Sequence, residues 1–385
     1  MNCLTRVYRM VQRSLLMGAV VALSACSMFS NKDPRFEPAP LVDYEARMPV
    51  AVRWSTPIGS GAGFGFIPAV VGRDVYAASA SGQVSRLDLG TGQVRWSANV
   101  GKRLSAGVGT DGQIVAVAAP DGTVIALDAQ GQELWRSKAT SEVNIPPAVG
   151  YGIVAVRSSD YRVQAFDART GDLLWSIQRP GPALALKTSM QMRVVDGLVV
   201  TGMPNGRVLL IDAATGALQW EGVISQSYGA TDLERISDVV GAPELVGSVM
   251  CAAAYQGRIV CFDMANQALP LWAEEFSTAR GIGVNMQMLY AADTRDSVVA
   301  FALESGHPIW EQNALRNRQL TAPAVHGNIV AVGDFEGYIH FLAPHDGRQM
   351  ARVRVGSRPI TSQPVAVEGG VLVQTDSGQL VFIGV

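Results

Sequence analysis

Tryptophan recurs along this 385-residue chain at intervals of about forty residues. The seven tryptophans are Trp54, Trp96, Trp135, Trp175, Trp220, Trp272 and Trp310. An eighth position in the series falls at Ala351, where the surrounding pattern continues without the indole. Because a fixed period of this size indicates a repeat array, the sequence predicts one structural unit repeated eight times.

Each repeat alternates short apolar runs with tight-turn signals, and nothing between the runs has a helical period. The clearest signal is a polar residue followed by glycine, which recurs at Ser81-Gly82, Asp121-Gly122, Asn205-Gly206, Gln256-Gly257, Glu336-Gly337 and Ser377-Gly378. Such pairs tolerate the positive φ angles that β-hairpin turns need. Four antiparallel strands in about forty residues are typical of the blade of a β-propeller.

The two ends of the chain supply complementary parts of one further blade. Residues 50–58 provide only the final strand of a repeat, whereas residues 361–385 provide three strands and stop where the fourth should begin. Pairing the two fragments leaves no long open sheet edge at the ring junction. We therefore expect an all-β fold: an eight-bladed β-propeller of four-stranded antiparallel blades, whose last blade is closed by the N-terminal strand.

The N-terminus has the features of an export signal. Three arginines precede a short apolar run at 15–23, which is too short to span a bilayer. The run ends in Leu23-Ser24-Ala25-Cys26, which resembles the lipobox of bacterial lipoproteins and implies cleavage before Cys26 and lipid addition to it. In lipoproteins a non-acidic residue after the cysteine, here Ser27, implies delivery to the outer membrane. An ordinary signal peptide with a chance cysteine is the alternative.

Three segments are therefore expected: a signal peptide at 1–25, a lipidated cysteine with a flexible, proline-interrupted tether at 26–47, and the propeller at 48–385. The formal net charge of −2 offers no basic field for nucleic acid. The two cysteines of the propeller, Cys251 and Cys261, flank a predicted hairpin turn. A cross-strand disulfide and two buried free thiols are both compatible with this placement.

One recurring motif, Asp-x-x-Thr-Gly-x-x-x-Trp, occurs at 88–96, 167–175 and 212–220. Its aspartate can accept backbone N–H groups of the following turn, and its tryptophan can fill the seam between neighbouring blades. The motif resembles the tryptophan-docking repeat of pyrroloquinoline quinone enzymes, which implies a periplasmic quinone-dependent dehydrogenase as the alternative function. That family also has adjacent cysteines and a calcium site, and this chain has no Cys-Cys pair.

Other catalytic constellations are absent from the sequence. The only histidines, His307, His326, His340 and His345, lack metal-ligand spacing. Neither a nucleophile-elbow motif nor a phosphate-binding glycine loop occurs. The sequence thus predicts no catalytic residue, no metal site and no cofactor, and hence a protein that is not an enzyme.

The repeat is interrupted at two places, and function in repeat folds tends to lie at such insertions. The longest intervals, from Trp175 to Trp220 and from Trp220 to Trp272, span 45 and 52 residues. In both, the extra residues lie between the tryptophan strand and the first strand of the next blade. Connections of this kind all leave a propeller on one face, so we expect the two insertions to form one patch.

The first insertion, residues 178–192, has two prolines that favour an extended path and then Leu184, Leu186 and Lys187. The two leucines should point the same way. Two exposed leucines beside a cation fit an anchor for a partner protein. The alternative is that the leucines fold over the ring.

The second insertion, residues 224–241, contains the capping-box pattern Thr231-Asp232-Leu233-Glu234, which predicts a single helical turn. The inner face of this turn is expected to carry Leu233, Ile236 and Val240. Its outer face is expected to carry Asp232, Glu234 and Asp238. An acidic element beside two leucines and a lysine suits protein recognition better than a small-molecule pocket.

Together, the lipobox, the ring and the two insertions resemble the BamB family of propeller lipoproteins in the bacterial β-barrel assembly (BAM) machinery. The most similar stretches are 182–187, 233–239 and 332–342. In that family the two insertions dock the periplasmic POTRA domains of the membrane subunit BamA. The resemblance implies that the contact residues are Leu184, Leu186, Lys187 and Asp238, with Lys187 where the family often has arginine.

The resemblance also implies a function and a location. The chain is expected to be a non-catalytic scaffold of the BAM complex, lipid-anchored at the periplasmic face of the outer membrane, that assists folding and insertion of outer-membrane β-barrel proteins. Besides the POTRA domains of BamA, unfolded outer-membrane proteins are expected partners. Their strands would pair with exposed blade edges by β-augmentation.

Overall fold

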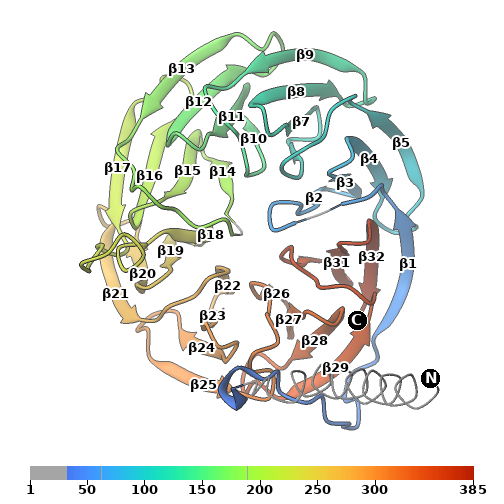
Figure 1. Cartoon of the computed structure of the whole chain (residues 1–385). Helices are drawn as coiled ribbons and strands as arrows, with labels where there is room; N and C mark the ends of the chain where they lie inside the picture. The colour runs from blue at the N-terminus through green and yellow to red at the C-terminus, as the bar shows by residue number, and fades with distance from the viewer. Residues whose placement is uncertain (1–32, 62, 189) are drawn as a thin grey trace, which may run out of the picture. The chain divides into compact units, whose positions relative to one another are not determined.

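Thirty-two strands form eight four-stranded antiparallel sheets that stand around a ring (Figure 1). The computed structural model describes residues 33–61, 63–188 and 190–385, so the expected signal peptide and Cys26 lie outside the described residues. The chain divides into two compact units, Met1–Pro38 and Ala39–Val385. In the first unit the described residues form a short 3-10 helix, η2 (Pro34–Phe36). In the second they form the ring, and the predicted eight-bladed propeller is confirmed.

Seven blades each consist of four strands that are consecutive in the chain. Blades 1 to 4 are β2 (Ala69–Val71), β3 (Asp74–Ala78), β4 (Gln83–Asp88) and β5 (Val94–Asn99); β6 (Gly109–Thr110), β7 (Ile114–Ala118), β8 (Thr123–Asp128) and β9 (Glu133–Lys138); β10 (Ala148–Gly150), β11 (Ile153–Arg157), β12 (Arg162–Asp167) and β13 (Leu173–Gln178); and β14 (Met192–Val195), β15 (Leu198–Met203), β16 (Arg207–Asp212) and β17 (Leu218–Val223). Blades 5 to 7 are β18 (Val239–Val246), β19 (Val249–Ala254), β20 (Arg258–Asp263) and β21 (Leu269–Glu275); β22 (Ile282–Val284), β23 (Met288–Ala292), β24 (Val298–Ala302) and β25 (Pro308–Gln312); and β26 (Ala324–His326), β27 (Ile329–Gly333), β28 (Tyr338–Leu342) and β29 (Gln349–Arg354).

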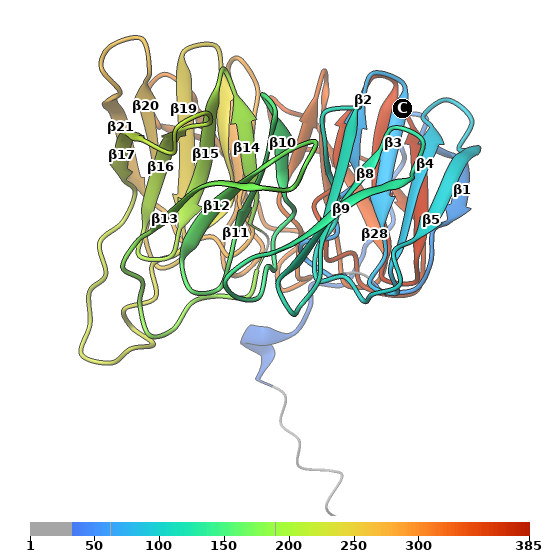
Figure 2. The same cartoon turned by 90° about the horizontal axis from the view of Figure 1, so that it is seen from above.

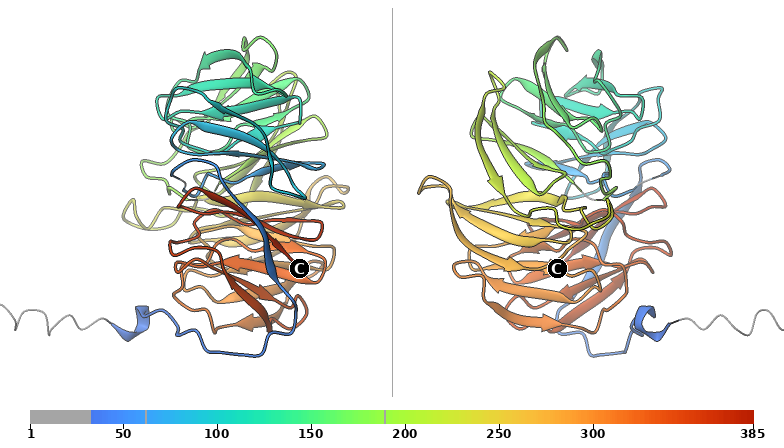
Figure 3. Two further views of the ribbon diagram at one scale, coloured as in Figure 1. Left: turned by 90° about the vertical axis from the view of Figure 1, so that its right-hand side faces the viewer. Right: turned by 60° about the vertical axis from the view of Figure 1, so that its left-hand side comes forward.

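Blade 8 joins the two ends of the ring. Its strands are β30 (Val365–Val367), β31 (Gly370–Gln374), β32 (Gln379–Gly384) and, outermost, β1 (Ala51–Pro57). β1 pairs antiparallel with β32, and the two strands lie side by side in Figures 1 and 3. The closure predicted from the two incomplete repeats is therefore confirmed.

Within a blade the two middle strands are the most buried, and the outermost strand is the most exposed. All five residues of β11 are buried, because neighbouring blades cover both faces of this inner strand. In the outermost strand of the same blade, β13, exposed and covered positions largely alternate. The outermost strands pair on one side only, which leaves their second edge available.

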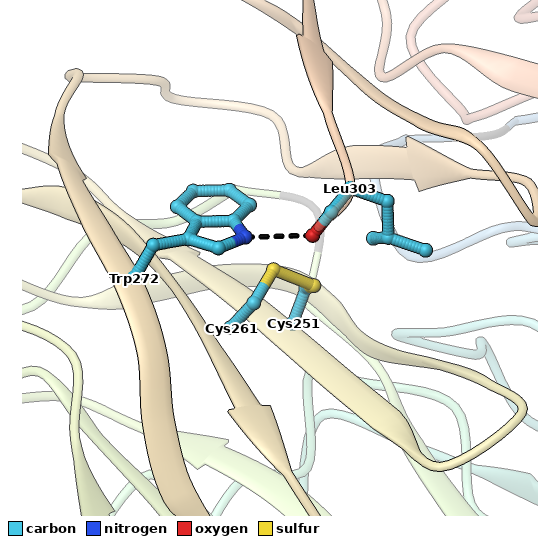
Figure 4. Close-up of a disulfide and its surroundings, with 4 residues drawn as sticks. All are labelled: Cys251, Cys261, Trp272 and Leu303. Carbon is cyan, nitrogen blue, oxygen red and sulfur yellow. Dashed lines mark hydrogen bonds between the residues drawn. A yellow bond between two sulfur atoms is a disulfide. The ribbon is translucent and has the colours of Figure 1, made fainter. Parts of the chain in front are cut away.

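The tryptophans join each blade to the next through a hydrogen bond as well as through packing. The indole N–H of Trp272 donates to the carbonyl of Leu303 in blade 6 at 2.7 Å (Figure 4). The same bond is made by Trp54 to Leu89, Trp96 to Ala129, Trp135 to Ala168, Trp175 to Ala213 and Trp310 to Pro344. This contact explains why glycine recurs at the same place in the repeats. A Cβ atom at Gly306 would lie 2.6 Å from the ring of Trp272. The turn needs glycine because the indole lies against its backbone.

Trp220 is the exception among these residues. The turn that it would reach in blade 5 has Gln267 and Ala268, both at φ 53°, in place of glycine. Trp220 instead packs edge-on against Phe262, with ring centroids 4.9 Å apart. The tryptophan still fills the seam, as predicted, but among the described residues its indole makes no hydrogen bond to the next blade.

The seam after blade 7 is closed by the N-terminal segment rather than by a tryptophan. Ala351 is fully buried, and Met48 and Val50 pack against the same apolar cluster. In blade 8 the outermost strand is β1, from the N-terminal side of the ring, so β32 and β1 are not joined by a docking turn like that at Gly306. The backbone N–H of Arg47 donates to Met350 at the outer edge of the blade, at 2.8 Å.

The same segment is ordered further toward the N-terminus than the sequence predicts. Ala39 donates its N–H to Arg316 at 2.9 Å and accepts a bond from the guanidinium of Arg318, also at 2.9 Å. The compact body therefore begins at Ala39 and not at the expected boundary, Met48. Residues 39–50 cover the outer edge of blade 7.

Cys251 and Cys261 form a disulfide (Figure 4). They lie directly opposite each other on β19 and β20, with Cα atoms 4.1 Å apart, and both are fully buried. Of the two states that the sequence allowed, the structure has the cross-strand disulfide. None of the helices in the described part of the chain is long and apolar enough to span a membrane.

Candidate functional site

Two long connectors leave the ring between the outermost strand of one blade and the innermost strand of the next. The first connector (residues 179–191) joins β13 to β14, and the second connector (residues 224–238) joins β17 to β18. Figure 2 shows the second connector standing out from one face of the ring. The insertions therefore lie where the tryptophan spacing predicts them.

The two connectors meet directly. The backbone N–H of Leu186 donates to a carboxylate oxygen of Asp238 at 2.6 Å. Met190 forms an isolated parallel bridge with Gly241, and the N–H of Gln191 donates to the Gly241 carbonyl at 3.1 Å. The prediction that both insertions contribute to one patch is confirmed.

The first connector is held at two further points. The hydroxyl of Tyr161 donates to the carbonyl of Pro182 at 2.8 Å, and a Cβ atom at Gly181 would lie 1.8 Å from the Tyr161 ring. At the other end the hydroxyl of Thr188 donates to the carbonyl of Ala279 in the connector before blade 6. The 183–187 segment is therefore suspended between fixed ends and is not a free loop.

The predicted anchor residues differ in exposure. The side chain of Leu184 is 43% exposed and Lys187 is exposed. Leu186 is half-buried and packs against the core cluster of blades 3 and 4. The expectation that both leucines project is thus met by Leu184, whereas Leu186 follows the alternative of folding over the ring.

The second connector contains the predicted helical turn. A carboxylate oxygen of Glu234 accepts the N–H groups of Ala230 and Thr231 at 2.8 and 3.1 Å. The N–H of Glu234 donates in return to the Thr231 hydroxyl at 3.3 Å. These reciprocal bonds are those of a capping box.

The predicted inner and outer faces of this turn need a correction. Ile236 and Val240 are buried as expected, but Leu233 is 67% exposed and Asp238 is fully buried. The turn ends at residue 235, so Asp238 lies beyond it, where the chain passes beneath the first connector. Helical periodicity therefore does not apply to Asp238. Leu233 and the 74% exposed Tyr228 instead add apolar surface to the second connector.

Asp238 supports the first connector from below. One of its oxygens accepts the Leu186 N–H. Burial raises the pKa of the Asp238 carboxyl, and the backbone N–H groups of Leu186 and Asn205 and the Arg157 guanidinium oppose that rise. Such a buried carboxylate fixes backbone geometry and does not itself reach a protein docked on the surface.

A cavity of about 530 Å³ lies beside the first connector. Its walls include Phe64 and Phe66 from the connector before blade 1, Ile145 from the connector before blade 3, and Arg157 at the end of β11. The guanidinium of Arg280 lies over the ring of Phe64 at 4.5 Å. The predicted residues Leu184, Leu186 and Lys187 are also among the lining residues.

Arg157 is not among the residues predicted from sequence, although the repeats contain a signal for it. Arg157 is the last residue of the second strand of its blade, and the position with the same pairing register in blades 1, 2 and 5 is alanine: Ala78, Ala118 and Ala253. Comparison of the repeats position by position identifies this substitution. No periodic pattern predicts the role of Tyr161, which lies in the turn between β11 and β12 and holds the first connector through its hydroxyl.

Two further expectations concern catalysis. The turn aspartates serve structure as predicted: Asp88 accepts the N–H groups of Gly90 and Thr91, each at 3.0 Å. Among the described residues, no group of three or more histidine, cysteine, aspartate or glutamate side chains is placed to hold a metal ion.

Comparisons with known proteins agree with the geometry. A family model described as outer membrane protein assembly factor BamB matches residues 80–312 and 295–384. The outer membrane protein assembly factor BamB of Bordetella pertussis is 52% identical over 370 residues, which cover 96% of either chain.

Among solved structures, BamB from Moraxella catarrhalis matches with a TM-score of 0.81 at 24% identity, over 87% of this chain and 100% of that chain. A europium-containing methanol dehydrogenase matches with a TM-score of 0.69 at 14% identity, over 87% and 93% of the two chains. At these identities both structural matches establish the fold and nothing further.

Proposed function

The chain belongs to the BamB family of outer membrane protein assembly factors, and we propose that it acts as a scaffold that binds the POTRA domains of BamA. It is an assembly factor by family and not an enzyme, since its likeness to dehydrogenases is confined to the fold. In this proposal a lipid on Cys26 anchors the protein at the periplasmic face of the outer membrane. The tether then raises the local concentration of the ring near its partner.

The observation that carries the proposal is the suspended 183–187 segment. It presents Leu184 outward between Tyr161, Asp238 and the Thr188 anchor. An apolar side chain on a segment that is already ordered binds with a smaller entropic cost than one on a mobile loop. The segment is thus suited to anchor a protein partner.

The residues of the site have different roles in this proposal. Leu184 is the apolar anchor, and Lys187 is a cation at the rim that pairs with an acidic group of the partner. Leu186 and Asp238 position the segment from beneath. The exposed Tyr228 and Leu233 of the second connector extend the apolar surface.

Binding of purified POTRA domains tests the proposal. We expect Leu184→Ala to weaken binding by about tenfold or more, as for an interface anchor. Leu173→Ala is the matched control, because Leu173 is a similarly exposed leucine on the outer strand of blade 3, at the end of that strand opposite the first connector. Unchanged binding of a folded Leu184→Ala protein, or an equal loss in the control, would refute the assignment.

Exposed blade edges favour a second role, transient pairing with unfolded outer-membrane proteins. In the described part of the chain the outermost strands of seven blades carry exposed large apolar residues: Val52, Val94, Leu134, Leu173, Leu218, Leu269 and Ile309. A photo-crosslinker at Leu134 should capture an unfolded β-barrel protein. One at Met350, where residues 39–50 cover the edge, should not. Equal capture at both positions would contradict edge pairing.

A further inference from the structure

Arg157 is a buried cation at a position where blades 1, 2 and 5 have alanine. Its side chain is 8% exposed, at the end of β11. One terminal nitrogen donates to the carbonyl of Gly202 in blade 4, and the other lies 2.9 Å from the sulfur of Met190 in the first connector. Both partners are neutral.

No carboxylate pairs with this guanidinium among the described residues. The nearest acidic group in electrostatic terms is Asp238, whose hydrogen bond goes to Leu186 instead. Burial lowers the pKa of Arg157 to about 10, so the group stays charged at neutral pH. Burying a charge without a counter-ion is costly, so an unpaired buried arginine needs an explanation.

The guanidinium also has unused hydrogen-bonding capacity. It carries five N–H groups in a planar fork, and the contacts to Gly202 and Met190 occupy two of them. Arg157 lines the 530 Å³ cavity beside the first connector. A fork of this kind matches the two oxygens of a carboxylate.

The rest of the lining mixes apolar residues with neutral polar ones such as Asn144 and Ser158, and its charged residues give it a positive bias. Phe64, Phe66, Ile145 and Leu186 supply apolar walls, and Lys187 is a second cation. Glu142 is the one acidic residue of the lining. A volume of this size lies within the range of sites that enclose a small ligand, and it accommodates one large side chain.

We propose that this cavity receives an apolar side chain together with a carboxylate from an extended segment of the protein partner, with Arg157 as the carboxylate receptor. The proposal rests on the proposed function in one respect, that the segment belongs to a docked protein. It adds a recognition site behind the exposed anchor Leu184, and it explains why the ring keeps a buried positive charge there.

The test uses small probes and the intact ring. N-acetylphenylalanine carries both the apolar group and the carboxylate, and N-acetylphenylalaninamide lacks only the charge. We expect the acid to bind about tenfold more tightly than the amide, as for a charge-assisted hydrogen bond. Chemical-shift changes should concentrate at Ile145, Leu186 and Met190.

Two variants make the result specific. Arg157→Met keeps the length of the side chain and removes its charge, so the preference for the acid should disappear. Glu142→Gln removes the only like charge of the lining, so binding of the acid should strengthen. The second variant keeps the test decisive if the first fails to fold.

The possible outcomes separate this proposal from the proposed function. Equal binding of acid and amide, or binding of neither at millimolar concentration, would overturn the receptor role and leave Arg157 as a support for Met190. If Leu184→Ala abolishes POTRA binding while neither probe binds, the scaffold function stands and the cavity proposal falls. If the acid binds selectively while Leu184→Ala leaves POTRA binding intact, the cavity proposal stands and the anchor role of Leu184 falls.

Discussion

The backbone N–H of Leu186 donates a 2.6 Å hydrogen bond to the buried carboxylate of Asp238, 52 positions further along the chain. The bond joins the first connector, between blades 3 and 4, to the second connector, between blades 4 and 5. It explains how two insertions that are separate in sequence become one surface.

Removal of the Asp238 carboxylate should loosen the first connector without unfolding the ring. A hydrogen bond to a charged group contributes about 1.5–3 kcal/mol, but burial of Asp238 opposes its ionisation, so the global stability of Asp238→Ala should change little. Hydrogen exchange at the amides of Leu186 and Lys187 should accelerate, and POTRA affinity should fall about tenfold. Asp238→Asn keeps a hydrogen-bond acceptor, so its exchange rates and its POTRA affinity should be closer to those of the unchanged protein. Unchanged exchange in Asp238→Ala would show that the bond does not hold the connector.

The docking glycines should be far less tolerant of alanine than other glycines with the same backbone angles. Gly306 has φ +75°, and a Cβ there would lie 2.6 Å from Trp272. Gly197 has φ +74° with no atom within 4 Å of its Cβ position. Gly197→Ala should therefore cost only the backbone strain, about 1–2 kcal/mol. Gly306→Ala should cost about 3 kcal/mol or more, since the indole must also move. Urea unfolding measures both, and equal losses would contradict the docking argument.

The loss of stability on replacing a tryptophan by phenylalanine should differ from one seam between blades to another. Trp272→Phe leaves the Leu303 carbonyl without its donor, which costs about 1–3 kcal/mol in addition to lost packing. Trp220→Phe removes an indole that makes no such bond among the described residues. The free energy of unfolding should therefore fall more for Trp272→Phe. A larger loss for Trp220→Phe would mean that packing, rather than the hydrogen bond, decides the strength of a seam.

His340 should make the ring less stable in mild acid. Its Nε2 atom lies 2.9 Å from a carboxylate oxygen of Asp334, and both residues are fully buried. Burial lowers the pKa of His340, with Asp334 opposing the shift. As the pH falls through about 6.5, the unfolded chain therefore binds a proton that the folded protein does not. Stability should decrease from there until the folded pKa is reached.

His340→Gln is the comparison for this effect, because it keeps a donor for Asp334 and does not titrate. The other three histidines are exposed and are common to both proteins. The difference in unfolding free energy between the two proteins should shift in favour of the variant between pH 7.5 and pH 5. A constant difference across that range would show that His340 does not couple folding to pH.

Much of the fold could be predicted because its information is periodic and local. The tryptophan interval, the polar-glycine turns and the incomplete repeats at both ends suffice for eight blades and their closure. The docking motif can also be recognised in the sequence, because its Asp, Gly and Trp lie within nine residues of one another. Each tryptophan reaches a turn of the next repeat, so the docking motif around Trp220 does not show that Gln267 and Ala268 replace glycine in its partner turn.

The candidate site was predictable in position but not in detail. Leu184 and Lys187 are exposed where the sequence places them, yet Asp238 lies beneath the surface and Leu233 on it. The helical spacing that predicts an inner and an outer face does not extend to Asp238, because the turn ends at residue 235. Arg157 and residues 39–47 were missed because their surroundings come from other blades.

The sequence by itself determined the number of blades, how the ring closes and where its connectors lengthen, because each of these follows from spacing along one chain. Only the tertiary structure decided which connector side chains are covered, which cysteine state exists and what faces the cavity. The reason is physical: burial and charge pairing depend on atoms brought together from distant repeats. Leu186 and Asp238 meet across 52 positions, and no local pattern encodes that contact.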